Sequence, residues 1–245
     1  MPIAIFTDIH GNREAFEACL AHAQRQRIDR CIFLGDYVGY GADPGFVVDT
    51  VKDLVRRGAV ALLGNHDSAA AGTAENMNSA AARAIEWTRH QLSPAQIDFL
   101  RQRPLTHTEG DCLYVHASAD APQTWDYVID ADAAERSFAA TAARLTLCGH
   151  THVPLLFKLS ANGRLAAFEP TAGAAIPCQD GRTLAVIGAV GQPRDQNPDA
   201  CYALHDDEAG TLTYVRVPYD VDAAATKIRA AGLPAMLAAR LALGQ

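Results

Sequence analysis

Five short apolar runs in this sequence are each followed by residues that can bind a metal ion or transfer a proton. The runs are 3–6, 31–34, 59–63, 113–115 and 145–148. A short apolar run that ends in glycine or polar residues is typical of a buried strand leading into a loop. The chain therefore has to fold so that several buried strands deliver polar side chains at their carboxyl ends.

The polar residues that follow these runs are aspartate, asparagine and histidine: Asp8, His10, Asp36, Asn65, His66, His116, His150 and His152. Helical segments separate the first three runs, and strands joined in this way pair in parallel through right-handed crossovers. Open α/β sheets bind their ligands beyond the carboxyl ends of such strands. We therefore expect these side chains to converge on one site, with segment 64–67 as a loop.

The rest of the chain supplies further helices and strands. We expect a helix at about 12–25, where apolar residues recur at three- and four-residue spacing. Further helices are expected at about 44–57, 69–92 with a break near Gly72, 94–102 and 131–143, and one or two helices at 223–243. We expect two hairpins, at 105–116 and 154–168, and further strands at 183–189, 201–204 and 211–217. This pattern predicts an α/β protein, a four-layer α/β/β/α sandwich of two mixed sheets flanked by helices, with residues 1–245 as a single domain.

Charge and composition restrict the partners. A formal net charge of −7 over 245 residues disfavours a protein that binds nucleic acid or an anionic membrane through bulk electrostatics. No apolar stretch approaches the roughly 20 residues of a membrane-spanning helix, and the N-terminus does not resemble a signal peptide. The six cysteines are dispersed, which favours reduced thiols and a cytoplasmic location. Edge strands in the second half leave a homo-oligomer as an open alternative.

The expected site contains nitrogen and oxygen donors without thiolates. Such a set suits borderline or hard divalent ions such as Mn, Fe, Zn or Ni, and not a sulfur-rich structural zinc site. The donors are too many for one tetrahedral ion and fit two ions that share a carboxylate. The sequence therefore predicts two divalent metal ions as cofactors.

The ordered blocks carry a family resemblance. Asp8-x-His10, Gly35-Asp36, Gly64-Asn65-His66-Asp67, the lone His116 and Gly149-His150-Thr151-His152 together resemble the calcineurin-like metallophosphoesterase superfamily. The segments 35–41 and 190–195 are similar to the small single-domain prokaryotic members grouped with diadenosine-tetraphosphatase-like phosphodiesterases. The resemblance extends from Asp8 to about Asp195, which is most of the chain.

The resemblance implies a role for each matching residue. Asp8, His10 and His152 would hold one metal ion, Asn65, His116 and His150 would hold the other, and Asp36 would bridge them, with Mn the favoured metal. A water bridging the ions would attack phosphorus as hydroxide. His66 would either donate a proton to the leaving group or contact a phosphate oxygen, and Asp67 would accept its other N–H and orient it.

Three residues near these blocks are candidates for substrate contact, each with an alternative. Arg13 is either a guanidinium that reaches a substrate phosphate or an exposed residue in the first turn of a helix. Tyr37 either stacks on a substrate ring or packs under the Asp36 loop. Arg194 either contacts substrate or pairs with Asp195.

These features predict a hydrolase: a dinuclear-metal-dependent phosphoesterase that cleaves phosphodiester or phosphoanhydride bonds of a small phosphorylated substrate such as a nucleotide. The alternatives are a phosphomonoesterase, including a protein Ser/Thr phosphatase, and a catalytically silent metal-binding scaffold. The complete set of candidate ligands disfavours the scaffold. The acidic charge disfavours a nuclease, and we expect neither a nucleic-acid nor a membrane partner.

Overall fold

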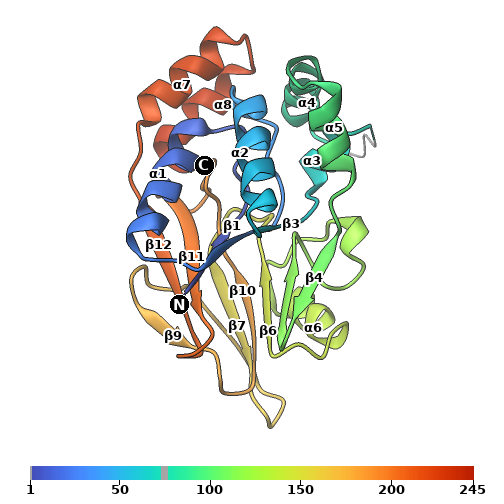
Figure 1. The fold of residues 1–245 in the computed structure, drawn as a ribbon. Coiled ribbons are helices and arrows are strands. Elements are labelled where there is room, and N and C mark those ends of the chain that lie inside the picture. Colours follow the sequence, from blue (N-terminus) through green and yellow to red (C-terminus); the bar gives the residue numbers. More distant parts are fainter. Residues whose placement is uncertain (1, 73–76) are drawn as a thin grey trace.

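The computed structural model describes residues 2–72 and 77–245, which form two six-stranded sheets with helices packed around them (Figure 1). The first sheet has the order β3 (Val60–Ala61), β2 (Arg30–Phe33), β1 (Ile3–Phe6), β11 (Ala200–Asp206), β12 (Thr211–Val217), β9 (Ala175–Pro177). The second has the order β4 (Thr106–Glu109), β5 (Cys112–Val115), β6 (Leu145–Cys148), β10 (Arg182–Val186), β7 (Leu155–Leu159), β8 (Leu165–Phe168).

Both sheets contain three adjacent parallel strands. In the first sheet β1 pairs in parallel with β2, and β2 with β3, while β1 pairs antiparallel with β11. In the second sheet β6 pairs in parallel with β5 and with β10, while β10 pairs antiparallel with β7. The carboxyl ends of the parallel strands are therefore the places where crossover loops leave each sheet.

The helices of the described residues are α1 (Arg13–Arg25), α2 (Pro44–Arg56), α3 (Asn65–Ala70), α4 (Ser79–Gln91), α5 (Pro94–Arg101), α6 (Ala131–Ala139), α7 (Val221–Ala230) and α8 (Ala235–Ala239). Their starts follow from local sequence. The side chain of Asn12 accepts the backbone N–H of Ala15 at 3.1 Å and caps α1, and Ser93 with Gln96 forms a capping box on α5. None of these helices is long and apolar enough to span a membrane.

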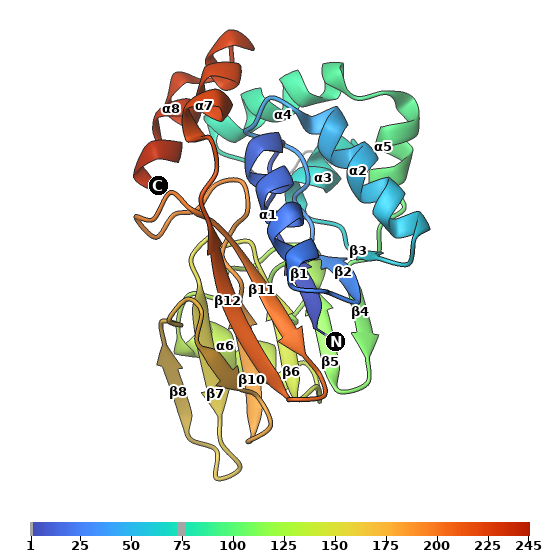
Figure 2. The same cartoon turned by 60° about the vertical axis from the view of Figure 1, so that its left-hand side comes forward.

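Side chains alternate between the two faces of each strand, and each sheet therefore packs on both faces, which gives four layers. Ile5 and Ile32 face the space between the two sheets, whereas Phe6 and Phe33 face the helices α1 and α2. On the other side of the second sheet, Phe138 of α6 packs against that sheet's outer face. Figure 2 shows α6 apart from the other helices, which gather at one end of the strands. The predicted α/β/β/α arrangement is confirmed.

Several predicted boundaries are wrong. Segment 64–67 is not a loop, because α3 begins at Asn65 and the Asp67 carboxylate accepts the Gly64 N–H at 3.1 Å, which caps the helix start. The strand predicted at 59–63 is shorter and consists only of β3, and the helix predicted to end at 143 ends at Ala139. The edge strand β9 is missed because it is short, exposed and contains proline.

Candidate metal centre

The segments that follow the parallel strands β1, β2, β3, β5 and β6 bring the predicted donors together. Asp8 and His10 follow β1, Asp36 follows β2, His116 follows β5, and His150 and His152 follow β6. All six side chains are buried. Asn65, the first residue of α3, is half-buried, and its Oδ1 lies 3.2 Å from His116 Nε2. The convergence expected from the strand ends is therefore present.

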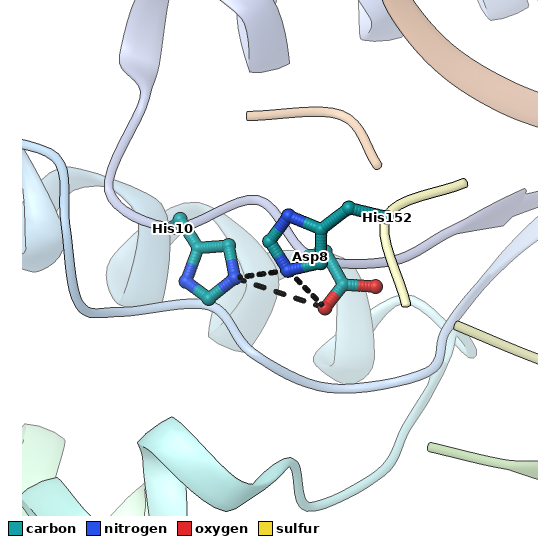
Figure 3. A group of neighbouring side chains, drawn as sticks. All are labelled: Asp8, His10 and His152. Carbon is teal, nitrogen blue, oxygen red and sulfur yellow. Dashed lines mark hydrogen bonds and ion pairs between the residues drawn. The ribbon is translucent and has the colours of Figure 1, made fainter. Parts of the chain in front are cut away.

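The first group of donors consists of Asp8, His10 and His152. Figure 3 shows the two imidazole rings and the carboxylate pointing toward one another. His152 Nε2 lies 3.3 Å from Asp8 Oδ1 and 3.1 Å from His10 Nε2, and His10 Nε2 lies 3.7 Å from Asp8 Oδ1. We call this set the first group.

The second group consists of Asn65, His116 and His150, with Asp36 between the two groups. His116 Nε2 lies 3.2 Å from His150 Nδ1 and 3.5 Å from Asp36 Oδ2. The same Asp36 oxygen lies 3.6 Å from His10 Nε2 of the first group. One carboxylate therefore faces donors from both groups.

Backbone carbonyls fix the orientation of three imidazoles. A carbonyl oxygen only accepts, so the ring nitrogen beside it carries the proton and the other nitrogen of a neutral ring presents a lone pair. The pairs are His10 Nδ1 with the Val38 carbonyl at 3.0 Å, His116 Nδ1 with the Leu34 carbonyl at 3.1 Å, and His152 Nδ1 with the Gln192 carbonyl at 2.6 Å. Each of these rings thus turns its Nε2 toward the centre, and in the neutral ring this atom presents a lone pair.

This donor set fits divalent cations. In their neutral forms His10 and His152 face each other through two lone pairs, so no hydrogen bond can join their Nε2 atoms. Asp8 Oδ1 is buried without a hydrogen-bond partner within 2–72 and 77–245, although its other oxygen accepts the Thr7 hydroxyl at 2.7 Å and the His150 N–H at 2.8 Å. A cation between these atoms would satisfy all of them.

The buried charges shift each other's pKa values. Burial raises the pKa of the Asp8 carboxyl, but His152 and His10 outweigh it and hold that pKa well below its usual range. Burial also raises the pKa of the Asp36 carboxyl, but nearby histidines, His116 most strongly, hold that pKa below its usual range. Both carboxylates are therefore ionised at neutral pH and available as ligands.

The pKa values of the histidines at the centre shift in two directions. Burial lowers the pKa of His150 to about 3 and that of His152 to about 4. Burial also acts against His116, but the adjacent Asp36 carboxylate raises its pKa to about 9. His150 and His152 are therefore neutral donors, and a proton in the second group lies on His116 beside Asp36.

The backbone is strained at the centre. Five of the candidate ligands lie in the left-handed region, which few non-glycine residues adopt: Asp8 (φ 52°), His10 (φ 50°), Asp36 (φ 56°), His150 (φ 68°) and His152 (φ 62°). The chain also approaches itself closely here, since a Cβ on Gly149 would lie 2.1 Å from Thr7 Oγ1 and 2.4 Å from Asp8 Oδ2. Strain concentrated at one cluster of donors indicates a functional site.

His66 lies at the edge of the centre. Its ring meets those of His10 and Tyr40 with centroids 4.7 Å and 4.5 Å away, and its Nδ1 has no hydrogen-bond partner in the described part of the chain. Burial lowers its pKa well below the ordinary value. A Cβ on Gly39 would lie 2.3 Å from His66 Nδ1, so Gly39 leaves room for the ring.

Asp67 does not make the contact expected of it. Its carboxylate accepts the backbone N–H groups of Asp36 at 2.7 Å, Tyr37 at 2.9 Å, Val38 at 3.3 Å and Gly64 at 3.1 Å, and not the His66 ring. Burial and the Asp36 charge raise its pKa, and the N–H donors oppose that rise. Asp67 therefore holds the loop that carries Asp36 and does not orient His66.

Two of the three expected substrate contacts lie outside the centre. Arg13 pairs with Glu17 at 3.1 Å on the surface of α1, and its guanidinium stacks on the Phe46 ring. Tyr37 is fully buried, and its hydroxyl donates to the Leu62 carbonyl. The structure therefore shows the alternative for each residue: Arg13 lies on the surface of a helix, and Tyr37 packs under the Asp36 loop.

Arg194 lies beside the centre. Its guanidinium is 5.8 Å from the centroid of the Tyr40 ring and donates to Gln192 Oε1 at 3.2 Å, while the neighbouring Asp195 pairs with Arg216 of β12. The alternative pairing of Arg194 with Asp195 is therefore wrong, and its guanidinium is free of carboxylate partners among the described residues.

Aromatic and hydroxyl residues surround the donors, and the sequence did not predict Thr7 or Tyr127 among them. Thr7 supports Asp8, the Tyr40 ring packs on His10 at 4.6 Å, and the Tyr127 ring stacks on His150 at 4.2 Å. Tyr40, like Tyr37, flanks Asp36 in the sequence, which predicts either stacking on a substrate ring or packing under that loop. Tyr127 belongs to a loop that carries no such signal.

The comparisons with known proteins agree with this geometry. Residues 1–210 match the model of the calcineurin-like phosphoesterase superfamily domain. The chain belongs to this superfamily. The predicted family is therefore confirmed, and the histidine–aspartate cluster is that of a metal-dependent phosphoesterase, a hydrolase.

Two relatives of this superfamily member match almost its full length, and a third matches part of it. A crystal structure of a metallophosphoesterase from Sphaerobacter thermophilus has a TM-score of 0.90 and 37% sequence identity, with 100% of this chain and 99% of the other covered. The uncharacterized protein MJ0912 of Methanocaldococcus jannaschii is 34% identical over 99% of this chain and 98% of its own length. A symmetrical bis(5'-nucleosyl)-tetraphosphatase of Paraburkholderia phymatum is 31% identical, over 60% of this chain and 53% of its own.

Proposed function

We propose that this phosphoesterase hydrolyses phosphodiester or phosphoanhydride bonds of a small substrate at a centre that holds two divalent ions. The observation that supports two ions is the position of Asp36, whose Oδ2 lies 3.6 Å from His10 Nε2 and 3.5 Å from His116 Nε2. A carboxylate between two sets of nitrogen and oxygen donors suits a pair of cations better than one.

Each ion has its own set of ligands in this proposal. Asp8, His10 and His152 would hold one, Asn65, His116 and His150 would hold the other, and Asp36 would be available to both. When bound, such ions polarise phosphoryl oxygens and lower the pKa of water, and Mn is the metal that we favour. To hold a cation His116 must release its proton, so binding is expected to weaken in acid.

His66 and Arg194 act on the substrate directly. In hydrolysis a water oxygen bonds to phosphorus while the ester P–O bond breaks, and the leaving oxygen needs a proton. His66 borders the centre with an unpartnered ring nitrogen, which supports a role for it as the donor of that proton. Burial keeps His66 neutral, and the negative charge of a bound phosphoryl group would raise its pKa toward the range of an acid.

The substrate class rests on two supports. The tetraphosphatase relative acts, by its name, on a bis-nucleosyl substrate, and a guanidinium without a carboxylate partner among the described residues flanks the centre at Arg194. Both favour a substrate with more than one phosphate or ester group over a simple phosphomonoester. The six cysteines are buried free thiols, which supports a reducing, cytoplasmic location.

The test is hydrolysis by metal-stripped protein reloaded with Mn²⁺. We expect turnover of bis(p-nitrophenyl) phosphate and of a dinucleoside polyphosphate to exceed that of p-nitrophenyl phosphate. His66→Ala should lower kcat by about 10²- to 10⁴-fold while bound Mn²⁺ stays near the wild-type amount. No turnover of any of these substrates would refute the proposal, and loss of metal from His66→Ala would refute the role of His66 as proton donor.

A further inference from the structure

The two sides of the metal centre present different surfaces to a substrate. His66, Tyr40 and Arg194 flank the first group, where the Tyr40 ring packs on both His10 and His66 and is only 6% exposed. Tyr127 and Trp125 flank the second group. The proton donor and the nearby cationic side chain thus lie beside the first group, and the Tyr127 and Trp125 rings lie beside the second.

Tyr127 is the most accessible of these rings. It stacks almost parallel on the His150 imidazole, with centroids 4.2 Å apart and planes 13° apart, yet 49% of the residue is exposed. A tyrosine with one face on a buried candidate ligand and half its surface free offers a second ring a place beside the centre. Tyr40, by contrast, is covered by the protein itself.

Trp125 extends this surface toward His116. Its ring meets His116 edge-on at 5.8 Å and 72°, and the residue is half-buried. Trp125 has a φ of 59° and Ala121, in the same loop, has a φ of 50°, which is unusual for residues with a Cβ. The loop is thus held in a costly conformation that directs an indole at the centre.

The chemistry of this loop excludes a site for a second phosphate. Segment 117–130 contains no lysine or arginine and carries Asp120, Asp126 and Asp130. On the other side, Arg194 and Arg240 both donate to Gln192 Oε1, at 3.2 Å and 3.3 Å. An anionic substituent therefore fits the Arg194 side, and an uncharged aromatic substituent fits the Tyr127 side.

We propose that Tyr127 and Trp125 are specificity-determining residues that bind an aromatic substituent of the phosphodiester, the one that stays on phosphorus during hydrolysis. The leaving oxygen has to face His66, on the side of the first group, so the retained substituent faces the second group and stacks on Tyr127. This inference rests on the proposed phosphoesterase function and goes beyond it by naming the part of the substrate that the enzyme selects.

The test compares substrates that share p-nitrophenol as the leaving group. Bis(p-nitrophenyl) phosphate retains an aryl group, methyl p-nitrophenyl phosphate retains a methyl group, and p-nitrophenyl phosphate retains neither. We expect Tyr127→Ala to lower the ratio of kcat/KM between the aryl and the methyl diester about 5- to 10-fold, the effect of removing one stacked ring. Tyr127→Phe keeps the ring and should restore the ratio, and Trp125→Ala should lower it.

Ile129→Ala is the matched control, because Ile129 is 61% exposed, apolar and on the same loop. It should keep the wild-type ratio. An unchanged ratio in Tyr127→Ala would overturn the inference even if the enzyme is active. An equal fall for all three substrates, with loss of bound Mn²⁺, would show that Tyr127 only supports His150 and would also overturn it. Failure of the wild-type protein to hydrolyse any of the three would refute the phosphoesterase function itself, and this inference with it.

Discussion

The two groups of donors use similar residues but are held differently. In the first group the outer nitrogens of His10 and His152 both donate to backbone carbonyls, and Asp8 accepts a hydroxyl and a backbone N–H. In the second group His116 is anchored in this way, whereas His150 turns its Nδ1 inward and rests against the half-exposed Tyr127. The first group is therefore preorganised, and the second depends on a loop.

This difference predicts two unequal metal sites. Rigid ligands with satisfied outer contacts bind an ion with less reorganisation than ligands steadied by an exposed ring. We expect the first group to bind Mn²⁺ more tightly than the second. Substitutions of ligands in one group or in both test that inequality.

The largest effect is expected from Asp36→Asn, because Asp36 faces both groups. Loss of its negative charge should weaken both Mn²⁺ sites and lower kcat/KM by on the order of 10³-fold or more. Bound metal after dialysis, measured by elemental analysis, and turnover of bis(p-nitrophenyl) phosphate check this. If one site keeps its wild-type affinity, Asp36 does not join the two groups.

A matched pair of variants separates the groups. His10→Ala should weaken the tighter Mn²⁺ site and His150→Ala the looser one, each by at least about 10- to 100-fold, the range found when even an outer contact of a ligand is lost. Calorimetric titration of Mn²⁺ into metal-stripped protein resolves the two affinities. His90→Ala, on the exposed face of α4, serves as control. Loss of the same site in both variants would contradict the division into two groups.

Asp67→Asn tests the support of the carboxylate that links the groups. The amide has one acceptor oxygen where the carboxylate has two, so its NH₂ would face backbone N–H groups of the Asp36 loop. We expect a loss of about 1–3 kcal/mol in the free energy of unfolding, or about 2–10 °C in Tm. Asp98→Asn, at an exposed ion pair with Arg101, should shift Tm much less. Equal melting of the two variants would exclude the structural role of Asp67.

The smallest effect concerns the stability of the metal-stripped protein at different pH values. Burial places the pKa of His150 at about 3 and that of His152 at about 4, below the ordinary 6.5, so their contribution to stability is complete above pH 6.5 and is lost as the pH falls toward 4. Asp36 raises the pKa of His116 to about 9, so its contribution is complete below pH 6.5 and is lost as the pH rises through 9.

Thermal melts of chelator-treated protein should therefore show a maximum of Tm near neutral pH, with a decrease of a few °C on either side. Mn²⁺ should flatten the alkaline branch, because an ion at the second group replaces the proton on His116. A Tm that keeps rising between pH 7 and 9 without metal would contradict the coupling of His116 with Asp36.

The sequence predicted the fold and the donors for a simple reason. The carboxyl ends of parallel strands lie at the same edge of a sheet, so residues placed after Phe6 and Phe33 meet where β1 and β2 pair. The packing of the two sheets against each other brings the residues after Cys148 of β6 beside them. The role of Asp67 could not be predicted, because its partners are backbone N–H groups some 30 residues earlier in the chain. Arg194 and Asp195 were ambiguous because Arg216, on β12, competes for the carboxylate through a tertiary contact.

The left-handed backbone at the centre limits how such a site can change. Aspartate, asparagine and histidine are the non-glycine residues that most readily adopt this conformation, and they also coordinate borderline divalent ions. The five left-handed donors are all aspartate or histidine. The left-handed backbone and a bound cation therefore favour the same few types of side chain. Retuning the enzyme toward a softer ion with cysteine would require the loop to be rebuilt together with the ligand.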